Sequence, residues 1–241
     1  MPRFFVPSLA EDTITLDREA GRHIARSLRC REGDPVELCD GRGTDGAGII
    51  SAIAGEVVTV TVQERKPSRG ELPCTVTLYQ ALPKGDKLEL IVQKAVELGA
   101  SAIVPVLTSR CVSRPDEKSF AKKRERLQKI ALEAAGQSGR GMVPEVRPLL
   151  PYPAALDEMA KSGCPVLFYE RATRPLGEVL APRPPVLSLL VGAEGGFSPQ
   201  EAEQAAAAGL AVCTMGPRIL RCETAPLYAL SAIGYTYENM R

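Results

Sequence analysis

Histidine is almost absent from this chain, since His23 is the only one among 241 residues. Histidine is the commonest metal ligand and the usual general base of a serine triad. A single copy therefore excludes most metal chemistry and makes a Ser/His/Asp arrangement a poor hypothesis. The seven cysteines are scattered and contain no C-x-x-C pair, which fits neither a disulfide framework nor a zinc site.

Long apolar runs are missing as well. No stretch of 18 apolar residues exists, so we predict no transmembrane helix, and the apolar run after Met1 is too short for a signal peptide. We therefore expect a soluble, cytoplasmic protein. An apolar content of 44% and a charged content of 24% are ordinary globular values, which excludes disorder, collagen and coiled coil. The length is enough for one standard domain and a small one.

The net charge of +1 conceals an uneven distribution. Residues 84–147 carry 13 Lys or Arg against 8 Asp or Glu. The basic side chains of this segment gather at Lys118, Lys122, Lys123, Arg124, Arg126, Lys129, Arg140 and Arg147. One interpretation is a solvated helix face, with Glu125 and Lys129 as an i,i+4 pair. The other is a surface that binds an anionic polymer, and charge alone leaves both open.

The first 65 residues have the pattern of a small β structure. Val58, Val60 and Val62 alternate with polar residues, which is typical of a strand with one buried face. We expect strands at residues 4–6, 35–39, 49–53 and 57–62, a helix over 17–28, a glycine-rich turn at 40–46 and a linker at 66–70. Short strands with turns at this spacing predict a small barrel.

Beyond residue 74 the strand and helix patterns alternate, which favours an α/β fold with a mostly parallel sheet. The predicted strands are residues 75–79, 102–107, 166–169, 186–191 and 212–215. The predicted helices are residues 87–98, 117–137, 154–161, 199–208 and 225–239.

Residues 40–43, Asp-Gly-Arg-Gly, superficially resemble a dinucleotide or methyl-donor loop. Such a loop has to follow a strand and open a helix whose N-terminus meets the ligand. Both flanks here have a strand pattern, so we favour a hairpin turn.

A second glycine-rich loop follows the predicted strand 186–191 and contains Gly192, Gly195 and Gly196. Ser198 and Glu201 form a capping box that begins the next helix. Ligands of open α/β sheets bind at the carboxyl ends of strands, and glycines allow a close approach of the backbone. The spacing is not G-x-G-x-x-G, which disfavours a Rossmann site. An ordinary turn explains one or two glycines, but hardly three beside Glu194.

A similar loop follows the predicted strand 212–215. A Gly-Pro turn at residues 216–217 ends the strand, and a helix begins near Thr224. Alone, this segment is better explained as a capped helix start in which Glu223 complements the helix dipole. Two such loops at neighbouring strand ends favour a binding site.

Together the two loops resemble a family signature. Gly-x-Glu-Gly-Gly-Phe-Ser-x-x-Glu at residues 192–201, followed by Gly-x-Arg-Ile-Leu-Arg-x-Glu-Thr-Ala at 216–225, is similar to the RsmE family. These are 16S ribosomal RNA (uracil-N3)-methyltransferases of the SPOUT superfamily. Further segments resemble the family in the same order along the whole chain, at residues 3–5, 23–29, 33–34, 94–99 and 133–140. Two positions depart from the pattern, because Ala193 replaces a proline and Cys222 a threonine, both by small residues.

The resemblance implies a PUA-like RNA-binding barrel over residues 1–70 and a SPOUT methyltransferase domain over 71–241, with a C-terminal trefoil knot. It also implies S-adenosylmethionine as methyl donor, no metal, and a homodimer with its sites at the interface. The implied substrate is 16S rRNA in the small ribosomal subunit, methylated on N3 of uridine 1498 in the decoding region.

The resemblance also assigns site residues. The donor contacts would be Phe168, Tyr169, Glu170, Val191, Gly192, Gly195, Gly196, Met215, Gly216, Ile219 and Leu220. Glu223 is the first candidate to orient the uracil or accept its N3 proton, with Glu194 second. Arg140 and Arg221 are candidates for charge stabilisation or phosphate positioning. The expected RNA contacts are Arg3, Arg22, His23, Arg26, Arg29, Lys122, Lys123 and Arg126.

Three other hypotheses stay open at this point. The nearest is another SPOUT enzyme that methylates a ribose 2′-hydroxyl or a different RNA, which product analysis would distinguish. A non-catalytic RNA-binding or ribosome-assembly protein with a vestigial donor site is the second, and the intact glycines and Glu223 argue against it. A nucleotide-dependent oxidoreductase is the third, and it lacks the phosphate-binding fingerprint.

Overall fold

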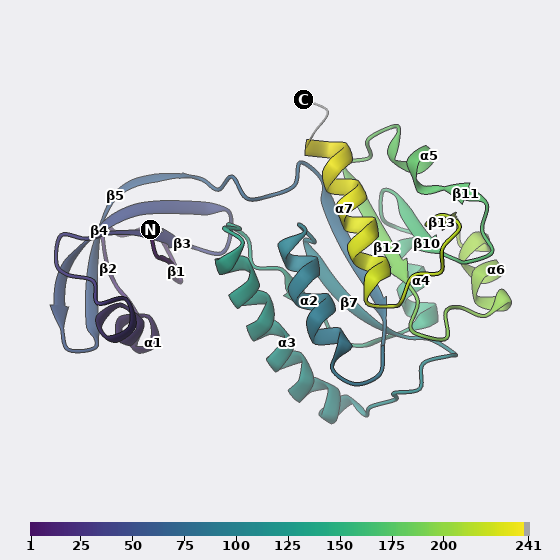
Figure 1. Cartoon of the computed structure of the whole chain (residues 1–241), viewed down its shortest axis with the longest axis horizontal. Coiled ribbons are helices and arrows are strands. Elements are labelled where there is room, and N and C mark those ends of the chain that lie inside the picture. Colours follow the sequence, from purple (N-terminus) through teal and green to yellow (C-terminus); the bar gives the residue numbers. More distant parts are fainter. Residues whose placement is uncertain (239–241) are drawn as a thin grey trace. The chain divides into compact units, whose positions relative to one another are not determined.

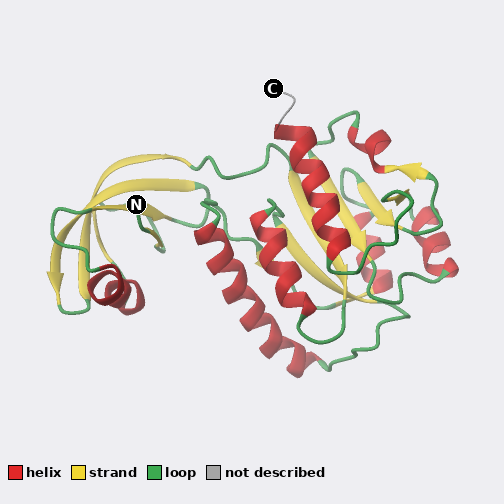
Figure 2. Ribbon diagram, viewed as in Figure 1, coloured by secondary structure: helices red, strands yellow, loops and turns green. Residues whose placement is uncertain are grey.

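The computed structural model of this protein describes residues 1–238 and divides them into two compact units (Figure 1, Figure 2). Unit 1 comprises Met1–Glu71 and Ala135–Val143, and unit 2 comprises Leu72–Ala134 and the chain from Pro144 onward. None of the helices in the described part is long and apolar enough to span a membrane. The last residue of the predicted C-terminal helix, Asn239, lies outside the described residues.

Unit 1 is built on a mixed five-stranded sheet in the order β1-β3-β4-β5-β2. Its strands are β1 (Arg3–Phe5), β2 (Thr13–Thr15), β3 (Pro35–Cys39), β4 (Thr44–Ala54) and β5 (Val57–Pro67). The β1–β3 pairing is parallel and the others are antiparallel. The helix predicted over 17–28 is present as α1 (Arg18–Arg22) followed by one turn of π-helix, η1 (His23–Leu28), with Asp17 as N-cap.

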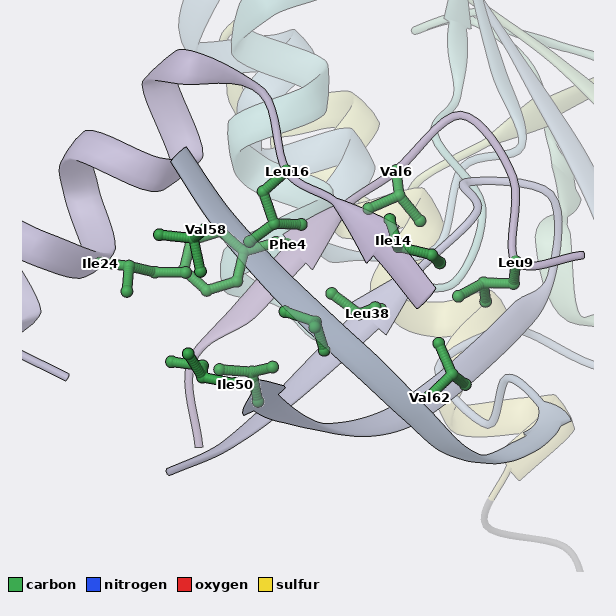
Figure 3. Close-up of a cluster of buried hydrophobic side chains, with 12 residues drawn as sticks. Phe4, Val6, Leu9, Ile14, Leu16, Ile24, Leu38, Ile50, Val58 and Val62 are labelled. Carbon is green, nitrogen blue, oxygen red and sulfur yellow. The ribbon is translucent and has the colours of Figure 1, made fainter. Parts of the chain in front are cut away.

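One apolar cluster fills unit 1, and Figure 3 shows its side chains converging from the strands and the helix. Val58, Val60 and Val62 are buried in it, as the alternation predicts. Helix α1 lies very close to the β4–β5 turn, because a Cβ on Gly21 would be only 2.0 Å from the carbonyl oxygen of Glu56. Glycine at this position therefore permits the packing of the helix on the sheet.

The second part of unit 1, Ala135–Val143, is tied to the sheet by backbone hydrogen bonds. The amide of Gly43 donates to the carbonyl of Gly141 at 2.9 Å, and the amide of Val143 donates to the carbonyl of Gly41 at 3.2 Å. The carboxylate of Glu71 accepts bonds from the amides of Gly141 and Met142 at 3.1 and 3.0 Å. The sequence did not predict that this segment belongs with the first 71 residues, because these contacts join residues 70 to 102 positions apart.

Unit 2 is built on an eight-stranded sheet in which every described pairing is parallel. The strand order is β11-β13-β10-β12-β6-β7-β8, and β9 pairs with β7. The strands are β6 (Thr75–Ala81), β7 (Ala102–Leu107), β8 (Glu145–Val146), β9 (Leu150–Pro151), β10 (Pro165–Phe168), β11 (Arg174–Pro175), β12 (Val186–Val191) and β13 (Ala211–Thr214). The α/β fold with a mostly parallel sheet is thus confirmed.

Helices cover both faces of this sheet. They are α2 (Lys87–Glu97), α3 (Glu117–Gln137), α4 (Tyr152–Met159), α5 (Leu176–Leu180), α6 (Pro199–Ala207) and α7 (Thr224–Glu238). In Figure 1, α2 and α7 lie side by side in front of the sheet and α4 lies behind it. Side chains of α4 and α6 share one apolar cluster with β6, β7, β10 and β12.

Several predicted boundaries were wrong. The turn predicted at 40–46 is shorter, because β4 begins at Thr44, and the predicted linker is shortened because β5 continues to Pro67 and pairs with Thr44. The glycines inside β4 led to the prediction of a turn, because glycine is common in turns. Gly48 instead allows close packing in the strand, since an added Cβ would lie 2.6 Å from Val60. The trefoil knot stays a prediction.

Candidate active site

A cavity of about 890 Å³ opens at the carboxyl ends of β10, β12 and β13. The strand order places β10 between β12 and β13, so the loops that follow these three strands meet at one edge of the sheet. The cavity is lined by residues 168–170, 172–173, 191–197, 214–222 and 225, together with Lys87 from the start of α2.

The loop after β12 is tightly folded around its glycines. A Cβ on Gly192 would lie 3.1 Å from Cα of Gly196, and Gly196 itself has a φ of 60°. The amide of Gly196 closes a turn on the carbonyl of Ala193 at 2.9 Å. Alanine thus accommodates the turn at the position where the RsmE pattern has proline.

Two side chains from neighbouring strands hold this loop. The buried side chain of Gln80, at the end of β6, donates to the carbonyl of Gly192 at 3.3 Å. Arg110, in the loop after β7, donates to the carbonyl of Gly195 at 2.8 Å. These two hydrogen bonds hold the backbone of the loop in place at the cavity wall.

Helix α6 begins at the predicted capping box, in which the side chains of Ser198 and Glu201 and their backbone amides bond reciprocally. Glu201 also accepts the amide of Ser109 at 2.8 Å, which ties the loop after β7 to the start of α6. Burial would raise the pKa of Glu201, but the amides of Ser109 and Ser198 hold that pKa below its usual range. The carboxylate is therefore an ionised, buried anchor between the loop after β7 and the start of α6.

The loop after β13 forms the other wall of the cavity. Gly216 has a φ of 99°, a left-handed conformation that favours glycine, and the side chain of Thr214 accepts its amide at 3.1 Å. The loop exposes Arg218, Ile219 and Arg221, and Ile219 is 89% exposed at the cavity rim. An exposed apolar side chain beside two cations is suited to a ligand with an aromatic ring and negative charge.

Four ionisable side chains form a cluster at the edge of the cavity. The ammonium of Lys87 lies 3.0 Å from Oε1 of Glu194 and 3.2 Å from Oε2 of Glu223. The thiol of Cys222 lies 3.2 Å from Oε2 of Glu223 and 3.7 Å from Nζ of Lys87. The side chain that replaces the family's threonine therefore still supplies a hydrogen-bond donor to Glu223.

Each member of this cluster has a shifted pKa. The carboxylates of Glu194 and Glu223 raise the pKa of Lys87. The pKa of Glu223 is lowered by its own backbone amide, then by Cys222 and Lys87. At Glu194, burial alone would raise the pKa, but Lys87 and nearby backbone amides lower it below its usual range. Burial, followed by Glu223, raises the pKa of Cys222 to about 12. At neutral pH the cluster therefore holds one cation, two carboxylates and a protonated thiol.

The residues predicted for the active site fall in two places. All eleven residues predicted to contact the donor line the cavity, as do Glu194 and Arg221, and Glu223 adjoins it through Lys87. Arg140 does not line it: the residue lies in unit 1, is 2% exposed and forms an ion pair with Glu71. A guanidinium buried in this way supports the fold of unit 1, and the role predicted for Arg140 stays a prediction.

The predicted RNA contacts also divide. Arg22, His23 and Arg26 are exposed on α1 and η1, Arg29 is exposed directly after η1, and Lys122 and Arg126 are exposed on α3. Lys123 is partly buried and its ammonium donates to the carbonyl of Gly85. Arg3 is not available to phosphates, because its guanidinium is 9% exposed and pairs with Asp45 and Glu37. The sequence around Arg3, which is followed by Phe4 and Phe5, gives no indication of these acidic partners.

Three residues around the cavity were missed from the sequence. They are Lys87, Gln80 and Arg110, which contact the loop after β12 or the carboxylate of Glu194 from positions 85 to 112 residues earlier in the chain. Only the sheet order, which places β6 beside β12, brings Gln80 and Lys87 to this loop. No local pattern in the sequence carries that information.

Comparisons with known proteins agree with this architecture. Residues 70–234 match the model of an RNA methyltransferase domain, and residues 16–63 match that of an RNA methyltransferase PUA domain. The chain is 37% identical to the ribosomal RNA small subunit methyltransferase E of Bacillus subtilis (strain 168), over 100% of this chain and 99% of that protein. It is 35% identical to the protein of the same name from Synechocystis, over 96% of this chain and 76% of that protein.

Two solved structures are also similar. The ribosomal RNA small subunit methyltransferase E of Neisseria gonorrhoeae, bound to S-adenosylmethionine, superposes with a TM-score of 0.88 and 35% identity over 97% of this chain and 96% of that one. A methyltransferase of Legionella pneumophila, in complex with the same cofactor, has a TM-score of 0.86 and 30% identity, with 96% of each chain covered.

Proposed function

We propose, from the premise that this chain belongs to the RsmE family of small-subunit ribosomal RNA methyltransferases, that it methylates N3 of uridine 1498 in 16S rRNA. The chain is an S-adenosylmethionine-dependent rRNA methyltransferase with a PUA domain and a SPOUT-type α/β domain. The observation that carries the finer proposal is the cavity at the ends of β10, β12 and β13, beside which two ionised carboxylates and Arg221 gather.

The cavity fits S-adenosylmethionine by size and by lining. Its volume of about 890 Å³ lies in the range that small-molecule sites occupy. Backbone of Gly192, Gly195 and Gly216 forms the walls, and no atom lies within 4 Å of where a Cβ on Gly216 would be, so the backbone there faces open space. Apolar side chains at Phe168, Val191 and Leu220, with Met215 and Ile219, would hold the adenine ring and the methionine chain.

Methylation of uracil N3 needs three things from the protein. The base has to be held in line with the methyl group, its N3 proton has to leave, and negative charge on O2 and O4 has to be stabilised. When bound, S-adenosylmethionine supplies an electrophilic methyl group on a sulfonium sulfur.

Glu223 is our candidate to accept the hydrogen bond or the proton from N3. Its carboxylate is ionised because its pKa is lowered by its own amide and by the Cys222 thiol, so it presents acceptor oxygens at neutral pH. Glu194 is the second candidate. Arg221, exposed on the cavity wall, is the candidate to stabilise charge on the uracil oxygens. Arg140 is left out of this set because it is buried against Glu71.

The remaining proposals concern organisation. Residues 1–70 would bind RNA and residues 71–241 would carry the reaction, with phosphate contacts from the exposed arginines of α1 and η1. We also propose a cytoplasmic homodimer. Exposed aromatic residues on α7 support a self-association surface, since Tyr228 and Tyr235 are 42% and 70% exposed and lie two helical turns apart on one face.

The experiment that tests this function is methyl transfer from labelled S-adenosylmethionine to small ribosomal subunits that lack their own modification, followed by digestion to nucleosides. We expect label in N3-methyluridine. Label in a 2′-O-methyl nucleoside would instead indicate ribose chemistry. Donor binding without transfer to any ribosomal RNA would indicate a non-catalytic protein, and both results would overturn the proposal.

A further inference from the structure

Lys87 connects three elements that surround the cavity. It is the first residue of α2, and its ammonium reaches Glu194 in the loop after β12 and Glu223 in the loop after β13. The two carboxylate contacts are 3.0 and 3.2 Å long. Lys87 is thus the cation that links the two wall loops at their acidic residues.

The helix itself gives no reason for a lysine at this position. The N-terminus of an α-helix carries partial positive charge, so a cation in the first turn is electrostatically unfavourable. The apolar face of α2 is formed by other residues, Leu88, Ile91 and Val92, all of them buried. The side chain of Lys87 is 36% exposed and contributes little to that core.

Two further groups bond to these glutamates, and each of them bonds to only one carboxylate. Glu194 accepts the backbone amide of Lys84 at 3.3 Å, and Glu223 accepts the Cys222 thiol at 3.2 Å. The ionisable groups that face Lys87 are Glu194, Glu223 and Cys222, from the two wall loops. Without the ammonium, two like charges would face each other with no cation between them, and they would repel.

We propose that Lys87 is a positioning residue for methyl transfer: by bridging Glu194 and Glu223, it fixes both carboxylates at the edge of the cavity where the target base meets the donor. The proposal rests on the proposed function, because it names the residue that orders that site. A misplacement of about 1 Å at a reacting centre costs about a hundredfold in rate. Loss of Lys87 should therefore lower kcat and leave the affinity for the donor almost unchanged.

The test compares Lys87→Met, Lys87→Arg and a matched control, Lys94→Met, with the wild type. Lys94 lies on the same helix, is also 36% exposed, and pairs with Glu97 at 2.8 Å, away from the cavity. For each protein, kcat is measured with small ribosomal subunits across pH, and the dissociation constant of S-adenosylmethionine is measured by calorimetry. The pKa values of Glu194 and Glu223 are followed by NMR of carboxylate-labelled protein without donor or RNA.

We expect Lys87→Met to lower kcat about a hundredfold. The acid limb of its pH profile should move upward by about one pH unit, because carboxylates without the cation ionise at higher pH. The NMR titrations of both glutamates should move in the same direction. Lys87→Arg should recover part of the rate, since a guanidinium can bond to two carboxylates. Lys94→Met should match the wild type in all three readouts.

Three results would overturn the proposal. Unchanged kcat and pH profile in Lys87→Met, with an active wild type, would remove the role of Lys87 and leave the proposed function intact. A large loss of donor affinity with normal kcat would place Lys87 in donor binding. An inactive wild type would contradict the proposed function itself, and the NMR titration would then show whether Lys87 pairs with the two carboxylates for another purpose.

Discussion

An added Cβ would have opposite consequences at two glycines of unit 2. At Gly192 it would lie 3.1 Å from Cα of Gly196 and 3.3 Å from the ring of Phe197, so the cavity loop would have to shift. At Gly177, in α5, it would meet no atom within 4 Å. A methyl group is therefore a direct probe of whether the backbone of this loop shapes the donor site.

We predict that Gly192→Ala weakens the binding of S-adenosylmethionine about tenfold or more, because overpacking costs about 1–3 kcal/mol and the strain falls on the cavity wall. Gly177→Ala should bind the donor normally and be as stable as the wild type or slightly more so. Calorimetric titration of both variants measures this. Equal donor affinity in Gly192→Ala and the wild type would show that the loop does not form the donor site.

Glu71 and Arg140 form an ion pair, with a buried guanidinium and a partly exposed carboxylate, that organises the second segment of unit 1. The carboxylate accepts bonds from Arg140 and from the amides of Gly141 and Met142. The guanidinium of Arg3 also reaches this segment, where it donates to the carbonyl of Arg140 at 3.0 Å. These contacts hold Arg140 and the segment around it on the sheet of unit 1.

We predict that Glu71→Ala lowers the free energy of unfolding by about 3 kcal/mol, because the buried guanidinium of Arg140 loses its carboxylate partner and two amides lose the bonds that Glu71 accepts. Glu64→Ala, at an exposed position of β5, should change it by less than about 0.5 kcal/mol. Urea unfolding of both variants checks the comparison. If Glu71→Ala were as stable as the wild type, the ion pair would not hold the second segment of unit 1 in place.

Long helices and strands with a clear hydrophobic pattern could be predicted from the sequence. The predicted bounds of α3 and β12 agree with the structure, because a 21-residue amphipathic run and an apolar run before a glycine loop leave few alternatives. The strands β2, β8, β9 and β11 were missed, since each has two or three residues. Such short strands form through distant partners, as when Ile14 of β2 pairs with Val60 of β5.

The same distinction holds for the candidate site. Glycines, a capping box and strand ends predicted the loops after β12 and β13, because these signals are local. The partners of those loops could not be predicted, because Lys87 and Gln80 reach them only through the order of strands in the sheet. Arg140 carried a motif resemblance, but its burial depends on Glu71, far away in sequence.

We predict that the anchor of α6 makes stability depend on pH. The pKa of Glu201 is below its ordinary value of about 4.5 in the folded protein, so its contribution is complete above that pH and is lost as pH falls through the folded-state pKa. Glu201→Gln should cost about 1–2 kcal/mol at pH 7. The difference between the two proteins should shrink below about pH 4.5, and a constant difference in urea unfolding down to pH 3 would contradict this role.

For the whole molecule, two exposed arginines, one in η1 and one directly after it, predict an electrostatic contribution to RNA binding. Arg26 is 71% exposed and Arg29 is exposed. The substitutions Arg26→Gln and Arg29→Gln should each reduce the slope of log affinity against log salt concentration by about 1. Arg174→Gln, at a half-exposed arginine outside the predicted contacts, should leave the slope unchanged. Equal slopes for all variants in filter binding would mean that Arg26 and Arg29 do not contact phosphates.

The most direct measurement locates the methyl group on the RNA. Wild-type protein and S-adenosylmethionine are incubated with small ribosomal subunits that lack the modification, and the 16S rRNA is cut into fragments whose nucleosides are identified by mass spectrometry. We predict one new N3-methyluridine, in the fragment that contains uridine 1498. A methyl group on a ribose 2′-hydroxyl, on another nucleotide, or on none would contradict it.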